Sequence, residues 1–469
     1  MATENTHYGY EKISRMLATA KSIYFIGIGG INMSSLAHIS QKRGYRTGGS
    51  DRTKTALTER LEATGIQIFY EHCAENLNGY DAVVYTVAIS PDNPEYVRAK
   101  ERGIPCISRA DYLGYLMTAY ACRVGIAGMH GKSSCTSMCA HTMIEAGAEP
   151  TVLSGAELSI MDGAYYVGNE ENFIFEACEY MDSFLDFNPT VAVVLNIEMD
   201  HVDYFQSMQQ IRDSFARYVA LTGKDGYAVI NGDDAEVLAA TKNYCGQSIT
   251  FGIDADALNV RAAQITCDRG KYTFDVLWNG AYFCHISLNV TGRHHIYNAL
   301  ACVAVCRLCG LSAEQIEQGL KRFGGARRRM EYKGKLNGAD VYDDYGHHPT
   351  EIRATLEGAR GLPHAGGRLF CVYQPHTYSR THALLDDFAC AFGDADRVLA
   401  VDIYAARETD TLGVSSALLA ERIGNRAVAC GDVDGAARIL LDELTPKDTV
   451  IIMGAGDIYR IYQYLPIEK

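Results

Sequence analysis

The chain has 469 residues, which is enough for roughly two to four domains, each with its own core. Its 43 basic and 57 acidic residues give a formal net charge of −14, which argues against a nucleic-acid partner because such a partner requires a basic surface. Its fifteen cysteines form no disulfide framework in so long a chain and predict a reducing compartment. We read no signal peptide and no apolar run of about 18 residues, so we expect a cytoplasmic protein without membrane contact.

The first predicted element is a buried strand that runs into glycines over residues 23–31 and leads to a helix start. This order is typical of a Rossmann-like turn that binds a pyrophosphate, although the third glycine of G-x-G-x-x-G is missing. About twenty residues on, Ser50 and Asp51 end a second strand, where the Asp51 carboxylate either accepts from a ribose hydroxyl or caps a turn. Strands and helices alternate up to residue 120 and predict one doubly wound domain. The glycines of the turn are Gly27, Gly29 and Gly30.

The next predicted strand leads into a glycine-bounded turn, a lysine and two hydroxyl side chains. This order fits a phosphate-binding loop at a helix N-terminus, where unpaired N–H groups and the helix dipole attract a polyphosphate. Lys132 can reach the β/γ oxygens and Ser133 can place its hydroxyl on a magnesium ion. Ile126 stands where the longer loop has its first glycine, so the motif is the shorter G-x-x-G-K-S. The loop residues are Gly128, Met129, His130, Gly131, Lys132, Ser133 and Ser134.

Two further strands end in residues of the types that bind metals. The strand over residues 173–178 carries Glu176 and is followed by Glu179, and the strand over residues 191–197 precedes His201. Because the carboxyl ends of parallel strands line the ligand crevice, we expect Glu176 and His201 near the phosphate loop. Together with the Ser133 hydroxyl, they form a candidate magnesium site beside a triphosphate.

The remaining chain predicts several short strands over residues 227–292, a long helix from His294 and a basic hinge or phosphate clamp over residues 327–329. Strands over residues 340–344, 369–374, 398–403 and 449–453 then predict a third α/β domain. Polar groups gather where these last strands end, as expected for a ligand crevice. They are Asp344, His347, His348, His376, Arg380, Arg407 and Asp457.

Taken together, these motifs resemble the Mur ligases of bacterial peptidoglycan synthesis, in the right order and along nearly the whole chain. Residues 128–134 match the short ATP loop of that family, and residues 175–179 and 196–201 match the stretches with its magnesium ligands. Its nucleotide-binding stretches match residues 292–298 and Arg329. The alanine-adding branch is indicated by residues 343–349, 374–376 and 379–380.

The resemblance implies an α/β fold of three domains: a Rossmann-like UDP-sugar domain over residues 1–121, a central P-loop ATPase-like domain over residues 122–325, and a Rossmann-like amino-acid domain over residues 326–469. It further implies that ATP, with Mg²⁺, activates the lactyl carboxylate of UDP-N-acetylmuramate as an acyl phosphate, which the amine of L-alanine then attacks. All implied partners are small molecules, and the protein is expected to be a monomer or a homodimer.

The resemblance also implies roles for individual residues. The catalytic residues would be Lys132, His201, His348 and Arg380, and the metal ligands Ser133, Glu176 and His201. ATP would bind the phosphate loop together with His294, Asn298, Arg329 and Asp344. The other substrates would bind Gly27, Gly29, Gly30, Ser50, Asp51, Glu179, His376 and Arg380.

Three positions depart from the patterns of the family. His295 replaces an asparagine, and Thr377 stands where many members have arginine. Phe215 matches the carbamoylated lysine of other Mur ligases, and its presence agrees with the alanine-adding branch. Two alternatives remain: a ligase that recycles murein tripeptide onto the same sugar nucleotide, and a regulator that binds the nucleotide and the UDP-sugar without ligation.

Overall fold

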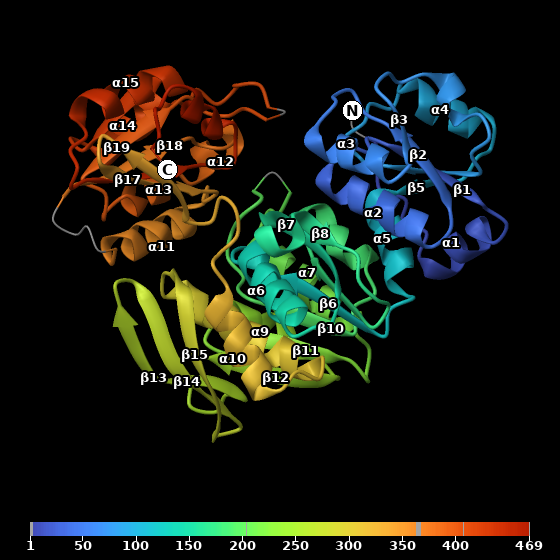
Figure 1. Cartoon of the computed structure of the whole chain (residues 1–469), viewed down its shortest axis with the longest axis horizontal. Coiled ribbons are helices and arrows are strands. Elements are labelled where there is room, and N and C mark those ends of the chain that lie inside the picture. The colour runs from blue at the N-terminus through green and yellow to red at the C-terminus, as the bar shows by residue number, and fades with distance from the viewer. Residues whose placement is uncertain (1–2, 203, 363–366, 407, 469) are drawn as a thin grey trace.

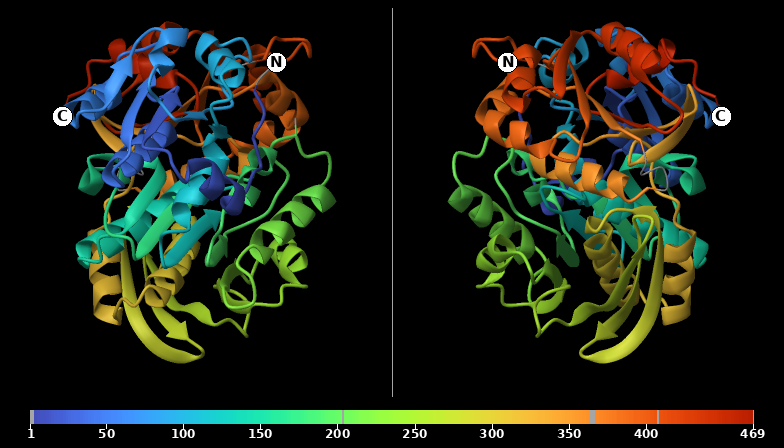
Figure 2. Two further views of the ribbon diagram at one scale, coloured as in Figure 1. Left: turned by 90° about the vertical axis from the view of Figure 1, so that its right-hand side faces the viewer. Right: turned by 90° about the vertical axis from the view of Figure 1, so that its left-hand side faces the viewer.

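Three β-sheets organise the chain into three lobes, which we call the N-terminal, central and C-terminal lobes (Figure 1). The computed structural model describes residues 3–202, 204–362, 367–406 and 408–468. The N-terminal and C-terminal lobes both lie above the central lobe (Figures 1 and 2). Within the described ranges, no helix combines the length and the apolar character needed to cross a membrane.

The N-terminal lobe has a five-stranded parallel sheet in the order β3-β2-β1-β4-β5. Its central strand β1 is buried along its whole length, as its apolar sequence predicts. The strand ends at Gly27, whose φ of +84° favours glycine and whose added Cβ would lie 2.8 Å from Thr86. The strands are β1 (Ser22–Ile26), β2 (Arg46–Ser50), β3 (Gln67–Phe69), β4 (Ala82–Tyr85) and β5 (Cys106–Ser108), and the helices α1 (Tyr10–Leu17), α2 (Ile31–Lys42), α3 (Ala56–Ala63), α4 (Pro94–Glu101) and α5 (Arg109–Met117).

The central lobe has a ten-stranded sheet in the order β15-β14-β13-β12-β11-β10-β6-β9-β7-β8. Strand β6 lies between β10 and β9 and is parallel to both, so the carboxyl ends of these strands meet at one edge. The strands are β6 (Cys122–Ala127), β7 (Thr151–Leu158), β8 (Gly163–Tyr166), β9 (Asn172–Glu176), β10 (Val191–Val194), β11 (Tyr227–Asn231), β12 (Gln247–Gly252), β13 (Val260–Asp268), β14 (Lys271–Trp278) and β15 (Ala281–Thr291). The helices are α6 (Lys132–Glu145), α7 (Met208–Ala220), α8 (Ala235–Thr241), α9 (His294–Leu308) and α10 (Ala313–Arg322).

The stretch 227–292 differs from the several short strands predicted for it. Strands β13, β14 and β15 have 9, 8 and 11 residues and pair antiparallel in a long ribbon. Helix α8 also lies in this stretch, between β11 and β12. The core of the lobe packs α6 and α9 against the sheet, and its buried residues include Ile126, Met138 and Ile296.

The C-terminal lobe has a six-stranded sheet in the order β16-β17-β21-β18-β19-β20, in which only β16 is antiparallel to its neighbour. The strands are β16 (Glu331–Leu336), β17 (Ala339–Asp344), β18 (Leu369–Tyr373), β19 (Arg397–Val401), β20 (Ala427–Gly431) and β21 (Thr449–Met453). The helices are α11 (Pro349–Arg360), α12 (Tyr378–Ala383), α13 (Leu385–Ala391), α14 (Ser416–Ile423) and α15 (Val433–Glu443).

Glycines mediate a close contact between the central and C-terminal lobes. At the turn between β13 and β14, the Cα of Gly270 would lie 2.8 Å from a Cβ added to Gly361, just after α11. The Cα of Gly292 would lie 3.3 Å from a Cβ added to Gly358 within α11. The two lobes therefore touch here through backbone, with no side chain between them.

Candidate active site

A cavity of about 1110 Å³ is lined by residues of all three lobes. The N-terminal lobe contributes Ile31, the residue directly after the glycine turn, and the C-terminal lobe contributes Arg329 and His347. The central lobe supplies residues from the carboxyl ends of its neighbouring strands, as expected for a parallel sheet. They include Lys132, Ser133, Glu176, Glu179, Asp200 and His201.

The phosphate loop joins β6 to α6 and is held in a conformation that requires glycine. Gly131, at the N-cap of α6, has a φ of +81°, and its added Cβ would lie 2.8 Å from the Oδ1 of Asn298. The side chain of Asn196 clamps the loop, because its Oδ1 accepts from the N–H of His130 at 2.8 Å and its Nδ2 donates to the carbonyl of His130 at 2.9 Å. The loop thus presents the N-terminus of α6 to the cavity, an arrangement that suits an anion.

Lys132 is held at the loop by a buried carboxylate. Its Nζ lies 2.9 Å from the Oε1 of Glu179 and also donates to the carbonyl of Gly128 at 2.6 Å. The same Oε1 lies 3.1 Å from the Nε2 of His201. Burial works against the charged lysine, but the Glu179 carboxylate raises the pKa of Lys132 above its ordinary value. A fully buried carboxylate therefore holds two bases beside the space where a phosphate would lie.

The three predicted metal ligands, Ser133, Glu176 and His201, line this same cavity. Glu176 ends β9 and accepts from the N–H of Gly155 through its Oε1, and the Ser133 hydroxyl accepts from Arg329 at 3.3 Å. The Oε2 of Glu179 is a further carboxylate oxygen, buried and without a hydrogen-bond partner in the described chain. Mg²⁺ prefers oxygen ligands, which Ser133, Glu176 and Glu179 offer here together with phosphate oxygens, and His201 is the one nitrogen donor of the predicted set.

A second cavity, of about 350 Å³, also borders the phosphate loop. It is lined by residues predicted to bind ATP, namely His130, Gly131, Ser134, His294, Asn298, Arg329 and Asp344. Asn231, at the end of β11, and Asp234, at the N-cap of α8, also line it and were not predicted. The sequence does hold a signal for them, a polar residue at the end of a strand and another three residues on, but it lies in the stretch for which the sequence predicts only short strands. Burial lowers the pKa of His294 to about 4, so this imidazole is neutral near pH 7.

In the N-terminal lobe, Ser50 at the end of β2 and Asp51 directly after it make different contacts. Asp51 accepts from the N–H of Gly29 at 2.9 Å, so its carboxylate braces the glycine turn. The Ser50 hydroxyl donates to Glu95 at 2.6 Å and lies 3.0 Å from the ring of His72. Ser50 is fully buried in this network, so its hydroxyl already has partners inside the lobe.

In the C-terminal lobe, Arg380 is buried and reaches across to the central lobe. Its Nε donates to the Oδ1 of Asp200 at 2.9 Å, and its Nη1 lies 3.3 Å from the ring of His376. Although burial opposes ionisation, the Arg380 guanidinium holds the pKa of Asp200 well below its usual range. Asp200 lines the large cavity, so Arg380 is joined to that cavity through it.

The other predicted groups at the strand ends of this lobe occupy several positions. His347 lines the large cavity, whereas His348 caps α11 with its Nδ1 at 3.1 Å from the Oε1 of Glu198. Asp457 accepts from Gln374 at 2.9 Å. Arg407 lies outside the described residues.

The three positions that depart from the expected patterns have clear surroundings. His295 is buried beside Asn298, with its Nδ1 at 3.3 Å from the amide nitrogen of that side chain. Thr377 has a φ of +66°, and its N–H donates to the carbonyl of Tyr404 at 2.9 Å. Phe215 is fully buried and packs edge-on against another phenylalanine, so this site offers no charged group.

Family models match three consecutive parts of the chain. The model described as "Mur ligase family, catalytic domain" matches residues 22–121, "Mur ligase middle domain" matches residues 126–306, and "Mur ligase, glutamate ligase domain" matches residues 328–456. A UDP-N-acetylmuramate–L-alanine ligase of Clostridium novyi is 44% identical over 444 residues, which cover 94% of this chain and 96% of that relative. The enzyme of the same name from Caldanaerobacter subterraneus is 45% identical over 445 residues, 94% of this chain and 96% of that relative.

Solved structures give the same result for the fold. A UDP-N-acetylmuramate–alanine ligase from Thermotoga maritima superposes with a TM-score of 0.78 at 26% identity, covering 94% of this chain and 98% of that one. A murein peptide ligase from Psychrobacter arcticus has a TM-score of 0.69 at 23% identity, covering 94% and 97% of the two chains, and supports the fold alone. These matches confirm the predicted α/β fold.

Proposed function

Because the chain belongs to the Mur ligase family along nearly its whole length, we propose that it joins L-alanine to UDP-N-acetylmuramate with cleavage of ATP to ADP and phosphate. The observation that supports this proposal most strongly is the 41–45% identity to alanine ligases over 94% of the chain. The reaction belongs to the synthesis of peptidoglycan precursors. The cavity shared by three lobes gives space for a nucleotide, a sugar nucleotide and an amino acid to meet.

The reaction consists of two transfers. The lactyl carboxylate of UDP-N-acetylmuramate attacks the γ-phosphorus of ATP, which releases ADP and leaves an acyl phosphate. The neutral amine of L-alanine then attacks the acyl carbon, and the tetrahedral intermediate expels phosphate to leave the amide. Phosphoryl transfer depends mainly on positioning and on neutralising charge.

Lys132 and its neighbours supply that charge and positioning in our proposal. Lys132 would move from Glu179 towards the β/γ oxygens, and the N–H groups at the start of α6 would bind the same phosphates. Ser133, Glu176 and His201 would hold a magnesium ion, which when bound neutralises phosphate charge. Support for these roles comes from their shared cavity and from the 2.9 Å contact between Lys132 and Glu179.

We propose that the three lobes divide the substrates among residues 1–121, 122–325 and 326–469. The glycine turn braced by Asp51 would receive the UDP-sugar, and the cavity beside His294 would receive the adenosine part of ATP. Arg380 would bind the alanine carboxylate, and His348 would lie near the amine. Every cysteine is free, which fits a reducing compartment such as the cytoplasm.

The test is phosphate release from ATP in the presence of UDP-N-acetylmuramate, with and without each acceptor. We expect release with L-alanine and little with murein tripeptide. Faster release with the tripeptide would identify the recycling ligase instead. Binding of ATP and UDP-sugar without release on addition of any acceptor would identify a regulator.

A further inference from the structure

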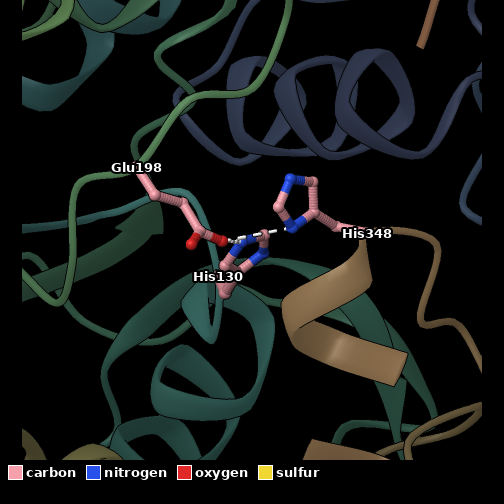
Figure 3. Close-up of side chains that lie close together, drawn as sticks. All are labelled: His130, Glu198 and His348. Carbon is pink, nitrogen blue, oxygen red and sulfur yellow. Dashed lines mark hydrogen bonds and ion pairs between the residues drawn. The ribbon is translucent and has the colours of Figure 1, made fainter. Parts of the chain in front are cut away.

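A cluster of three metal-binding side chains lies between the phosphate loop and the C-terminal lobe (Figure 3). His130 comes from the phosphate loop, Glu198 from the segment after β10, and His348 from the start of α11. One ligand atom of each lies within 4.8 Å of the others. The Oε1 of Glu198 lies 3.1 Å from the Nδ1 of His348 and also contacts the Nε2 of His130. None of the three belongs to the magnesium set Ser133, Glu176 and His201.

Neighbouring groups orient two of these side chains towards the centre of the cluster. The Oε1 of Glu351 lies 3.4 Å from the Nδ1 of His130, which leaves the Nε2 directed at Glu198. The hydroxyl of Thr350 donates to the Oε2 of Glu198 at 3.0 Å and leaves the Oε1 for the cluster. A histidine with a carboxylate on its far nitrogen, and a carboxylate with a hydrogen bond on its second oxygen, are typical of metal ligands.

The charge and shelter of the cluster also suit a cation. The side chains of His348, His130 and Glu198 are 6%, 12% and 33% exposed, so the site is sheltered but reachable from solvent. Two carboxylates, Glu198 and Glu351, flank the imidazole of His130. They raise the pKa of His130 to about 10 despite its burial, so a divalent ion would take the place of the proton that compensates them in the metal-free protein.

We propose that His130, Glu198 and His348 bind a divalent transition-metal ion, of which Zn²⁺ is the best fit. Two imidazole nitrogens and one carboxylate oxygen, with a fourth position left to water, form a common zinc ligand set. Imidazole also suits cobalt and nickel, whereas magnesium prefers oxygen ligands throughout. The proposal is tested by binding of the metal alone, so its outcome is distinguishable from that of the proposed ligase activity, in which His130 and His348 also have roles.

The proposed metal site lies between two lobes, so a bound ion would affect how they are held together. Two ligands belong to the central lobe and the third to the C-terminal lobe, so the ion would connect the two lobes. His130 lies within the phosphate loop, so the same ion would fix the loop against α11. Zinc would then act on this protein at a position separate from the magnesium of the nucleotide.

The test uses Co²⁺ with the full, nucleotide-free chain in alkaline buffer, because the metal must displace the proton from His130, whose pKa the neighbouring Glu198 and Glu351 raise to about 10 despite burial. Visible absorption reports the ligands, because cobalt on histidine and carboxylate lacks the intense charge-transfer band that thiolate ligands give. We expect Co²⁺ to bind without that band, and Zn²⁺ to displace it. Glu198→Gln removes the shared carboxylate and is expected to weaken binding roughly tenfold or more.

Two control variants separate this site from others. Excess Mg²⁺ keeps the Ser133, Glu176 and His201 set filled, so Glu176→Gln should leave Co²⁺ binding to the cluster unchanged. His285→Ala, which removes an exposed histidine paired with Asp275, should leave it unchanged as well. His348→Gln provides a second loss of a ligand in case Glu198→Gln does not fold, as judged by thermal unfolding without metal. Equal binding by the wild type and both ligand variants, a thiolate band, or loss of binding in Glu176→Gln would overturn the proposal.

Discussion

At the scale of single residues, the centre of the site is a buried carboxylate shared by two bases. Glu179 holds Lys132 at 2.9 Å and His201 at 3.1 Å through one oxygen. Because Lys132 keeps a partner before any ligand enters, its buried charge is compensated in the free protein. A triphosphate can then replace this partner without creating an unpaired charge.

Lys132→Met tests the role of this charge. We expect the rate of phosphate release to fall roughly 100- to 1000-fold, on the order of the loss seen when one preorganised group that stabilises a transition state is removed. Steady-state assays with all three substrates measure it. The control is Lys242→Met, which changes an exposed lysine after α8 and should retain full activity. Normal turnover by Lys132→Met would refute the role.

Because the imidazole of His294 is buried, we expect the folded protein to lose stability in acid. Burial lowers its pKa to about 4 in the folded protein, against about 6.5 when unfolded, so the unfolded chain binds more protons between these values. Stability therefore falls as the pH drops from 6.5 towards 4, by on the order of 3 kcal/mol from this residue.

Over that pH range, the midpoint temperature of thermal unfolding should fall by less in His294→Asn than in the wild type. Its matched control is His285→Asn, since His285 is half exposed and lies on β15. Parallel acid profiles for His294→Asn and the wild type would contradict the assignment.

At the scale of elements, the buried parallel strands were predictable because their apolar runs are continuous. The sequence predicts the strand over residues 449–453 with the bounds that β21 has, and it extends others, such as 173–178 for β9 (Asn172–Glu176), into the loop that follows. Such overrun is expected because apolar side chains continue past the last ladder hydrogen bond. The β13–β15 ribbon was read as shorter strands because its outer face is polar and its register shifts within each pair.

Helix α6 has a left-handed glycine at each end, which allows a matched test of the phosphate loop. Gly131→Ala places a Cβ 2.8 Å from Asn298, whereas at Gly147, with a φ of +73°, an added Cβ meets nothing within 4 Å. Both variants bear the cost of a left-handed alanine, about 1–2 kcal/mol. We expect only Gly131→Ala to lose nucleotide affinity, by more than about tenfold, because only there must the loop itself shift.

Calorimetric titration with a non-hydrolysable ATP analogue measures this difference, and thermal unfolding measures the shared cost. If Gly147→Ala lost affinity to the same degree, strain in α6 rather than the shape of the loop would be responsible.

The sequence predicts contacts within one lobe more readily than contacts between residues of two lobes. The strand ends of the central lobe and the phosphate loop predicted residues that line the two cavities, because these follow from local order along the chain. The predicted residues of the N-terminal lobe line neither cavity; they are Gly27, Gly29, Gly30, Ser50 and Asp51. Pairs such as Asp200 with Arg380 and Glu198 with His348 join residues about 150–180 positions apart, across two lobes. Nothing local in the sequence marks such a pair, so the sequence identifies Glu198 and Asp200 only as part of the stretch that ends at His201.

At the scale of the whole molecule, the described arrangement is one in which the central and C-terminal lobes are in contact. The buried pair of Asp200 and Arg380 joins them, and Arg329 reaches the hydroxyl of Ser133. Substrates on different lobes can react only in such an arrangement, so opening and closing are expected to accompany turnover.

Asp200→Asn tests how far this pair holds the lobes together. Removing one partner of a buried pair costs about 3–5 kcal/mol, so we expect the ligand-free variant to be more open and to have a larger radius of gyration than the wild type. Small-angle scattering, with and without nucleotide analogue and UDP-sugar, measures the change, and ligands should reduce the radius. The control is Glu236→Gln, which breaks a partly exposed pair with Arg212 inside the central lobe. Identical scattering curves for Asp200→Asn and the wild type would exclude this role.

The glycines between the β13–β14 turn and α11 have a consequence for how the lobes can move. Both surfaces are glycine backbone here, so no side chains interlock between the lobes. One surface can therefore slide over the other without a change of side-chain rotamers. The glycines that face each other are Gly270 and Gly361, and Gly292 and Gly358. A methyl group added on α11 or directly after it would contact the backbone of the central lobe and push the two lobes apart. A methyl group at Gly358 or Gly361, where φ is not positive, would therefore hinder this movement without forcing a left-handed residue.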